Sequence, residues 1–278
     1  LLLGGDAGPG RRGLRTDSII VVSIDSVTGD TVIISIPRNL ERMPFPEGTA
    51  LAERYPDGFT DLANAVWTRV DQTRELVGGV DDAGSQAIKL GISQLLGIPI
   101  HNYVLVDMAG FVDVVDALGG IDINVTKRMP TPGNPQGAKH DLPEFIEAGQ
   151  QHMDGTLALA YSRTRSADSD THRMARQQCV LGGIAGAFTP MALVFGFTEL
   201  VSAFGNAVHT DISRSELDDF AQLIDRFLEA GGKSAIRALH LGRPLVDPYR
   251  WRLAEVRALV TETITSTTPN APLLEEHC

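Results

Sequence analysis

Runs of apolar residues near the start of the chain predict three strands. Residues 1–5 predict a short buried strand, and the β-branched run SIIVVSID at 18–25 predicts a second one. A turn-forming DSVTGD sequence leads into TVIISI at 31–36, which predicts the returning strand of a hairpin. Pro37 cannot donate a backbone hydrogen bond and ends this strand, so Arg38 is expected just past its end.

Apolar residues at intervals of three or four predict helices along the rest of the chain. The Pro- and Gly-rich stretch 41–60 predicts a surface loop, and so does 129–143. Ser213 and Glu216 fit a capping box ahead of an amphipathic helix. The other predicted helices cover 62–77, 83–96, 111–118, 154–163 with Asp154 as N-cap, a region starting near 173, and 250–265, while short strands are predicted at 103–106 and 121–125.

The alternation of strands and helices without an internal repeat predicts an α/β fold. We expect a single three-layer α/β/α domain over residues 1–278 with a central mixed sheet, because no stretch has the composition of a linker. Hydrophobic residues make up 43% of the chain, which is enough for a substantial core. No charged residue occurs between Arg176 and Glu199, but Pro190 and several glycines interrupt this stretch. It therefore favours two apolar helices, buried or lining an apolar groove, over a membrane span.

The chain opens with LLLGGD, as though inside a strand, and does not begin with Met. We expect that a segment precedes it, so the lack of a signal or anchor is no evidence for a cytosolic protein. Its two cysteines, Cys179 and Cys278, are too few for a zinc site of the CxxC type. They would be free thiols in the cytosol and could pair in an oxidising compartment.

The balance of acidic and basic residues shows which kinds of ligand the protein is suited to bind. There are 24 basic and 35 acidic residues, which gives a formal net charge of −11. Non-specific binding of nucleic acid depends on neutralising phosphates with Lys and Arg, so this balance argues against it. An anion site is still compatible with the sequence where arginines cluster, because the local field follows the local charges.

The densest cluster of basic residues consists of Arg163, Arg165, Arg173 and Arg176. In an extended stretch the first two would point the same way, and on a helix the last two would share a face. Guanidinium groups this close repel one another unless an anion lies among them, and phosphate oxygens match their bidentate geometry. The alternative is that the arginines pair with Asp168 and Asp170 on a solvated surface.

Two acidic residues near the first strands could hold a divalent cation. Asp6 follows one predicted strand and Asp17 precedes the next. Magnesium takes one or two carboxylates together with substrate phosphate oxygens, whereas the alternative for each Asp is ordinary turn chemistry. Arg15 and Arg38 are expected at the same sheet edge, which is where ligands bind in open α/β sheets.

Other catalytic patterns are missing from the sequence. It contains no Walker loop, no HExxH pair and no nucleophile elbow. His172 lies within the arginine region and could relay protons, although a structural role fits equally well.

Three segments resemble the LytR-CpsA-Psr family. The opening LLLGGDAGPGRRGLRTDSIIVVSID, followed by VIISIPRNL, resembles the start of the family domain. GFVDVVDALGGIDINV resembles its middle, and LALAYSRTRSADSDTHRMARQQCVL resembles its arginine-rich region. The three segments occur in the family's order and span most of residues 1–181, whereas the last third of the chain carries less of the likeness.

The resemblance implies a single-pass enzyme of the cell membrane whose catalytic domain lies outside the cytoplasm. Such a phosphotransferase moves a cell-wall glycopolymer from a polyprenyl-pyrophosphate carrier onto peptidoglycan and leaves a phosphodiester link. Across the family the polymer is teichoic acid, capsule or arabinogalactan, and the actinobacterial likeness of this chain suggests arabinogalactan ligation. With water as acceptor the same site would be a polyprenyl-pyrophosphatase, and without turnover it would be a lipid-carrier binding module.

The resemblance also implies roles for individual residues. By position, Asp6 and Asp17 look like the family's ligands for Mg²⁺ (or Mn²⁺). The uncharged helices at 180–204 look like part of the wall around the polyprenyl chain. Substrate-binding residues implied by the motifs are Arg15, Arg38, Arg163, Arg165, Arg173, Arg176 and Gln177. Those expected to take part in the chemistry are Arg38, Arg163, Arg165 and Asp17, with Asp17, Asp168 or Asp170 as a possible base.

Two positions depart from the family's pattern. Asn39 stands where the family usually has Asp, and Thr171-His172 replaces a pair that is more often aromatic-glycine. Neither change removes a proposed phosphate or metal ligand, so we expect activity with an altered donor or acceptor preference. An extracytoplasmic location also favours a Cys179–Cys278 disulfide, which would close a loop of about 100 residues and stabilise the fold by roughly several kcal/mol.

Overall fold

A six-stranded mixed sheet forms the centre of the computed structural model, which describes residues 1–6, 14–135, 137–164, 170–187 and 208–266. The strand order is β10-β3-β2-β1-β4-β9, with β1/β4 and β3/β10 parallel and the other pairs antiparallel. The strands are β1 (Leu2–Gly5), β2 (Thr16–Ile24), β3 (Thr31–Ile36), β4 (Val104–Asp107), β9 (Val208–Thr210) and β10 (Ile236–His240). The expected mixed α/β sheet flanked by helices is confirmed.

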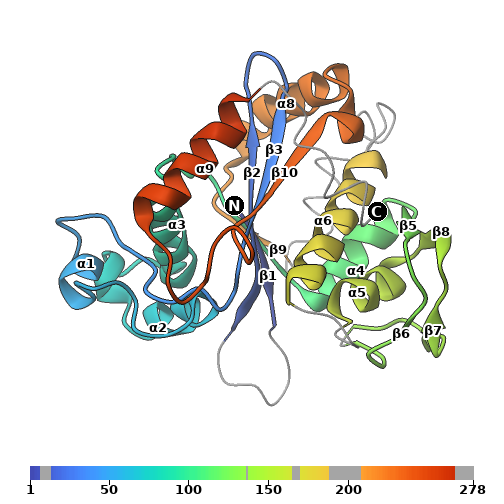
Figure 1. The fold of residues 1–278 in the computed structure, drawn as a ribbon, viewed down its shortest axis with the longest axis horizontal. Coiled ribbons are helices and arrows are strands. Elements are labelled where there is room, and N and C mark those ends of the chain that lie inside the picture. The colour runs from blue at the N-terminus through green and yellow to red at the C-terminus, as the bar shows by residue number, and fades with distance from the viewer. Residues whose placement is uncertain (7–13, 136, 165–169, 188–207, 267–278) are drawn as a thin grey trace.

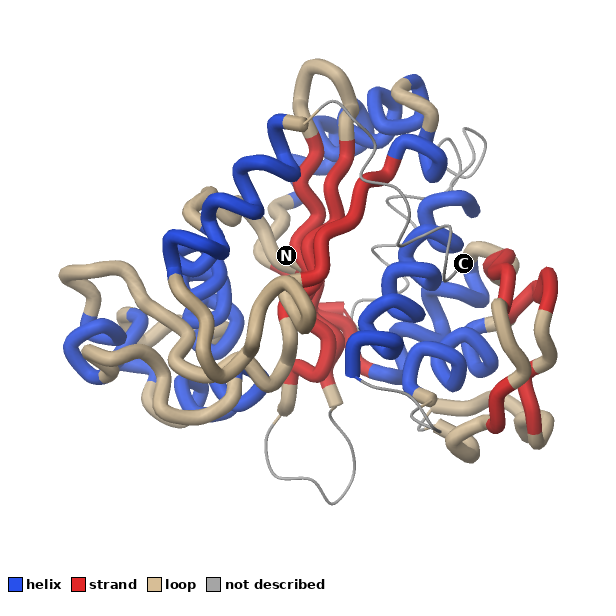
Figure 2. The backbone as a smooth tube through the Cα atoms, viewed as in Figure 1, coloured by secondary structure: helices blue, strands red, loops and turns tan. Residues whose placement is uncertain are grey.

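Helices cover both faces of this sheet, which runs as one band through the middle of the molecule (Figure 1, Figure 2). One face carries α1 (Ala50–Arg54), α2 (Val66–Asp71), α3 (Ala83–Leu96) and α9 (Leu253–Thr265). The other carries α4 (Met108–Ala117), α5 (Gly155–Arg163) and α6 (Asp170–Ala187). Helix α8 (Leu217–Glu229) packs against the β2–β3 turn, where a Cβ on Gly29 would lie 2.1 Å from the carbonyl oxygen of Arg226.

Short elements complete the fold. Two small hairpins, β5 with β8 and β6 with β7, lie at the outer edge of the α4–α6 layer (Figure 1). Their strands are β5 (Ile121–Val125), β6 (Met129–Pro130), β7 (Phe145–Ile146) and β8 (Gly149–Met153), and the 3₁₀ helices are η1 (Ala63–Ala65), η2 (Arg74–Val77), η3 (Arg214–Glu216) and η4 (Gly232–Ala235).

The two faces of the sheet differ in what covers them. Side chains alternate along β2, so Ile19 and Val21 point into the main core with α3, whereas Ile20 lines a cavity on the opposite face. A second core joins α5 and α6 to the β5–β8 hairpin and includes Tyr161 and Val180. The α4–α6 layer therefore has its own core. A cavity lies between this layer and the sheet.

Several expected elements need correction. The predicted loop 41–60 contains α1, whose first turn is capped by Thr49 through a hydrogen bond from the Ala52 N–H. The predicted helix 62–77 is broken into η1, α2 and η2, although its apolar residues recur at helical spacing, because Thr73 leaves the helical conformation (φ −136°, ψ 54°) between α2 and η2. Strand β5 pairs with β8 and not with the main sheet. The predicted capping box at Ser213 and Glu216 is confirmed.

The structure also bears on the expectations about a membrane span and about a disulfide. Among the helices of the described residues, none is long and apolar enough to cross a bilayer. Cys179 is 1% exposed and disulfide-bonded, which fits a bridge in an oxidising compartment. The expected partner, Cys278, lies outside the described residues.

Candidate active site

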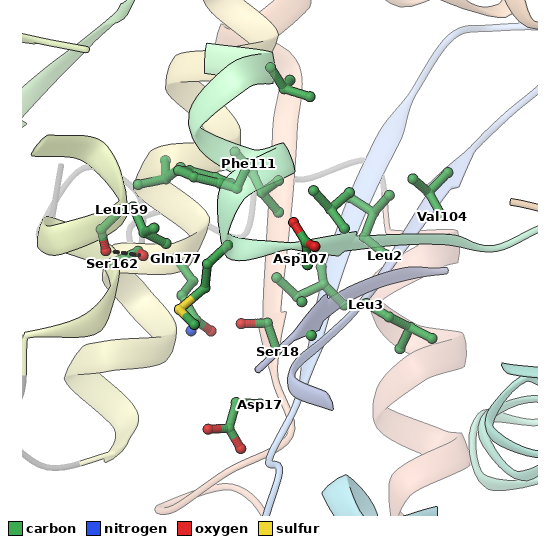
Figure 3. Close-up of a pocket in the computed structure, with 18 of the residues that line it drawn as sticks. Leu2, Leu3, Asp17, Ser18, Val104, Asp107, Phe111, Leu159, Ser162 and Gln177 are labelled. Carbon is green, nitrogen blue, oxygen red and sulfur yellow. Dashed lines mark hydrogen bonds between the residues drawn. The ribbon is translucent and has the colours of Figure 1, made fainter. Parts of the chain in front are cut away.

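A cavity of about 1240 Å³ opens between the sheet and the α4–α6 layer. Its lining is divided by chemistry into one charged end and a longer apolar part. Figure 3 shows Asp17 at one end of the cavity and Phe111 toward the other, with Gln177 of α6 on the helical side. The polar lining consists of Asp6, Arg15, Asp17, Ser18, Arg38, Asp107, Asn134, Thr210, Ser162, Arg163, Arg173 and Gln177. Asp107 also accepts a hydrogen bond from the Gly110 N–H as the N-cap of α4.

The acidic pair is placed by the β1–β2 hairpin. Gly4 pairs with Ser18 and Gly5 pairs with Thr16, so Asp17 is the extra residue of a β-bulge. The backbone N–H groups of Asp6 and Asp17 both donate to the carbonyl oxygen of Arg15, at 2.8 and 3.1 Å. One carbonyl therefore holds the two carboxylate-bearing residues beside each other at the cavity.

Asp17 is held by two partners from other parts of the chain. Its Oδ1 accepts a hydrogen bond from Asn64 Nδ2 at 2.9 Å and lies 3.0 Å from Arg38 Nη1. Burial alone would raise the pKa of Asp17, but the Asn64 hydrogen bond and the charges of Arg38 and Arg173 outweigh it. The pKa of Asp17 is therefore lowered, and the carboxylate is ionised at neutral pH.

Asn64 is a site residue that the sequence analysis missed. Its side chain is buried at 3% exposure, and its backbone N–H donates to the carbonyl oxygen of Arg38 at 3.0 Å. It thus contacts both members of the Asp17–Arg38 pair without lining the cavity itself. The short η1 helix that carries it gives little periodic signal, so the sequence offered no sign of this role.

The Asn64→Ala substitution is expected to raise the pKa of Asp17 toward its usual range. A carboxyl group whose folded pKa is depressed adds stability above its unfolded pKa, and this stability is lost as pH falls through the folded pKa. The variant should therefore lose about 1–2 kcal/mol at pH 7 and less near pH 3. Urea unfolding at both pH values measures this, with Asn124→Ala in β5 as the control, and equal losses at the two pH values would contradict it.

The arginine cluster is only partly assembled at the cavity. Arg163 is the last residue of α5 and Arg173 lies in α6, and both line the charged end. Arg163 ends α5 at the position predicted for the end of the 154–163 helix. The expectation that Arg163 and Arg165 point the same way depends on Arg165 and stays a prediction. Arg165 and Asp168 lie outside the described residues, as does the side chain of Asp170.

Arg176 takes a different place from the one expected. Its Nη2 donates to the carbonyl oxygen of Thr164 at 2.6 Å, and the residue is 4% exposed and absent from the cavity lining. Gln177, four positions after Arg173, lines the cavity with it because residues at this spacing share a helix face. Arg176 thus ties α6 to the end of α5. His172 is exposed and is not part of the lining.

The apolar part of the cavity is built by four helices and the sheet. The expected wall at 180–204 is described up to residue 187, and Val180, Leu181 and Ile184 do line the cavity. The opposite walls come from β1, β4, α4 and α8, and no local pattern in the sequence indicated them. These walls contain Leu2, Val104, Val106, Phe111, Val114, Leu118, Leu217 and Phe220.

The donor set at the charged end suits a hard divalent cation. Asp6 and Asp17 provide two carboxylates at one cavity, and no group of three or more His, Cys, Asp or Glu side chains arises in the described parts of the chain. Magnesium usually accepts one or two protein carboxylates and completes its shell with water and phosphate oxygens. Because Oδ1 of Asp17 is engaged by Arg38 and Asn64, Oδ2 is the oxygen available to such an ion.

Comparison with known proteins adds independent information. A family model described as the LytR_cpsA_psr family matches residues 1–241. A Bacillus anthracis protein named polyisoprenyl-teichoic acid--peptidoglycan teichoic acid transferase TagU is 28% identical over 227 residues, which is 79% of this chain and 62% of that protein. The chain therefore spans about three fifths of the length of this relative.

Solved structures share the fold. The crystal structure of B. subtilis TagV is 25% identical, with a TM-score of 0.66, and the match covers 96% of this chain and 97% of that one. A structure described as TagT bound to LIIa-WTA is 21% identical, with a TM-score of 0.60, and covers 95% of this chain and 88% of that one.

Proposed function

The chain belongs to the LytR-CpsA-Psr family, and we propose that it is a phosphotransferase that moves a cell-wall glycopolymer from a polyprenyl-pyrophosphate carrier to peptidoglycan. The observation that carries the proposal is the continuity of the cavity. A charged end with arginines and two carboxylates opens directly into a long apolar part. A pyrophosphate joined to a prenyl chain has the same two-part chemistry. The relative named as a teichoic acid transferase to peptidoglycan supports the same reaction.

The arginines would act on charge that grows during the reaction. Positive charge at the cavity would neutralise the negative charge on the leaving polyprenyl phosphate. It would come from Arg15, Arg38, Arg163 and Arg173, which line the cavity, and from Arg165. Gln177 would help to orient the phosphate oxygens. A hydroxyl group of peptidoglycan attacks the phosphorus that carries the sugar, the bond to the bridging oxygen breaks, and polyprenyl phosphate leaves. Such catalysis is mostly positioning and electrostatics.

Asp6 and Asp17 would hold Mg²⁺ or Mn²⁺. When bound, the ion supplies positive charge to the pyrophosphate oxygens. Asp17 is a weak base because its pKa is lowered, so holding this charge suits it better than taking a proton from the acceptor. Asp168 and Asp170 are the remaining choices for a base.

The polymer and the cellular location are part of the proposal. Teichoic acid is the polymer in the name of the curated relative, and arabinogalactan is the alternative for an actinobacterial enzyme. We place the domain outside the cytoplasm, held at the cell membrane by a single-pass segment that precedes it. Its partners are then the lipid-linked glycopolymer and the peptidoglycan acceptor.

Metal removal is the direct test of this function. Purified protein is incubated with a polyprenyl-pyrophosphate-linked saccharide and peptidoglycan fragments, and the saccharide joined to peptidoglycan is quantified by mass spectrometry. We expect transfer with Mg²⁺ or Mn²⁺, loss of transfer with EDTA, and recovery when the ion is restored.

The same assay separates the rival functions. Release of phosphate at the same rate with and without peptidoglycan would identify a pyrophosphatase and contradict transfer. Binding of the lipid carrier without metal-dependent turnover would identify a binding module.

A further inference from the structure

We propose that Tyr249 and Asn39 form a subsite for a sugar ring of the acceptor glycan, next to the charged end of the cavity. This inference rests on the proposed transfer reaction and adds where its second substrate binds. Neither residue lines the main cavity, which the lipid-linked donor would fill.

The subsite lies beside the charged end of the cavity. Asn39 follows Arg38 directly, and its Nδ2 donates to the hydroxyl of Tyr249 at 2.9 Å. Gly242, at the start of the segment that carries Tyr249, lies close to Pro37 and to Met174 of α6, since a Cβ built on it would lie 3.7 Å and 3.9 Å from their side-chain atoms. Segment 242–251 therefore borders the charged end between Arg38 and the start of α6.

The exposed surface of this segment is unusual for the molecule. Among the described residues, four large hydrophobic side chains are strongly exposed, and two of them, Leu245 at 54% and Tyr249 at 44%, belong to this segment. A tyrosine ring combines a flat apolar face with a polar edge, and that pairing suits a sugar ring, which has apolar C–H faces and a rim of hydroxyl groups.

The segment is held in place before any ligand binds. Pro248 accepts a hydrogen bond from the Glu41 N–H at 3.0 Å, and the Trp251 indole N–H donates to the Glu41 carbonyl oxygen at 2.7 Å. The Tyr249 N–H also donates to Asp247 Oδ1 at 3.1 Å. A side chain on such a fixed support loses little freedom on binding, which favours affinity.

The direction of the Asn39 hydrogen bond prepares the tyrosine hydroxyl to act as a donor. The amide N–H₂ of Asn39 can only donate, so the Tyr249 oxygen accepts and its own proton is left to donate to a ligand. An ionised aspartate at position 39 could only accept a hydrogen bond, so the Tyr249 hydroxyl would donate to it and not to a ligand. The residue at position 39 therefore sets whether Tyr249 can donate to a sugar oxygen.

Arg42 links this subsite to a second cavity. Arg42 donates to the Tyr249 carbonyl oxygen at 3.3 Å and also lines a cavity of about 370 Å³ with Tyr55, Asp57, Gln94 and Trp251. This mixture of aromatic and polar side chains suits further units of the same neutral glycan strand. The acceptor would then run from the second cavity across Tyr249 to the phosphates.

The test compares acceptor and donor binding in the variants Tyr249→Ala, Tyr249→Phe and Asn39→Asp. Lysozyme-released peptidoglycan fragments are the acceptor probe, and Val80→Ala is the control for losing an exposed apolar side chain elsewhere. We expect the KM for acceptor to rise about tenfold in Tyr249→Ala and about threefold in Tyr249→Phe and Asn39→Asp, with affinity for the lipid-linked donor unchanged.

An unchanged acceptor KM in Tyr249→Ala, or an equal loss of donor affinity, would overturn the subsite. Absence of transfer by the unaltered protein would instead overturn the proposed function. In that case isothermal titration of the same peptidoglycan fragments decides the subsite, which stands if Tyr249→Ala weakens their binding and falls if it does not.

Discussion

Replacing Arg38 with alanine should reduce glycopolymer transfer about 100- to 1000-fold, the range seen when one fixed charge-stabilising donor is removed from an active site. Arg38 lines the charged end of the cavity and orients Asp17 through the 3.0 Å contact with its Oδ1. The variant loses positive charge at the phosphates and one of the two contacts that hold Asp17. Because Asn64 still binds Asp17, the fold itself should survive.

Rate measurements at saturating donor and acceptor test this expectation, with circular dichroism to monitor folding. Arg128→Ala is the matched control, because that side chain is 54% exposed, pairs with Glu147 and does not line the cavity. Arg38→Lys should recover only part of the rate, since an ammonium group cannot form the bidentate contact. Retention of most transfer in a folded Arg38→Ala protein would remove Arg38 from the mechanism.

Replacing Leu181 with aspartate should weaken binding of a long-chain polyprenyl donor about 100-fold, because a prenyl chain would have to desolvate the new carboxylate. Leu181 lines the apolar part of the cavity but belongs neither to the core that holds α6 nor to the main core. The substitution therefore acts on the cavity wall and leaves the packing of the helix largely intact.

The length of the prenyl chain provides the internal control for this variant. A short donor, with a methyl group in place of the prenyl chain, should bind Leu181→Asp almost as well as it binds the unaltered protein, because it has no chain to contact the new charge. Leu181→Met keeps the wall apolar and should bind both donors normally. Equal weakening of long and short donors would show that the apolar cavity does not hold the lipid.

Much of the fold could be predicted because strands β2 and β3 are buried and carry unbroken apolar runs. Asp6 follows the first strand as predicted, whereas Asp17 is the second residue of β2 and does not precede that strand. Strands β9 and β10 were not predicted, because they have three and five residues and are defined by their neighbours in the sheet more than by a pattern of their own.

The details of the site depend on tertiary structure that no local pattern records. Asn64 reaches Asp17 across 47 positions, and the bulge at Asp17 depends on the register between two strands. Arg176 was misplaced because the face that a helical residue presents depends on how the helix packs. The capping box at Ser213 and Glu216 and the apolar stripe of 83–96 are local signals, and they were therefore predictable from the sequence.

The Arg15 carbonyl oxygen accepts hydrogen bonds from both Asp6 and Asp17, so the position of these two residues does not depend on the connection at 7–13. Both carboxylate-bearing residues are fixed by hydrogen bonds that close before the connection at 7–13 begins. Insertions or deletions within that connection leave these bonds in place, so its length is open to evolutionary change while the spacing of the carboxylates is preserved. One backbone oxygen thus fixes the spacing of the two proposed metal ligands, Asp6 and Asp17.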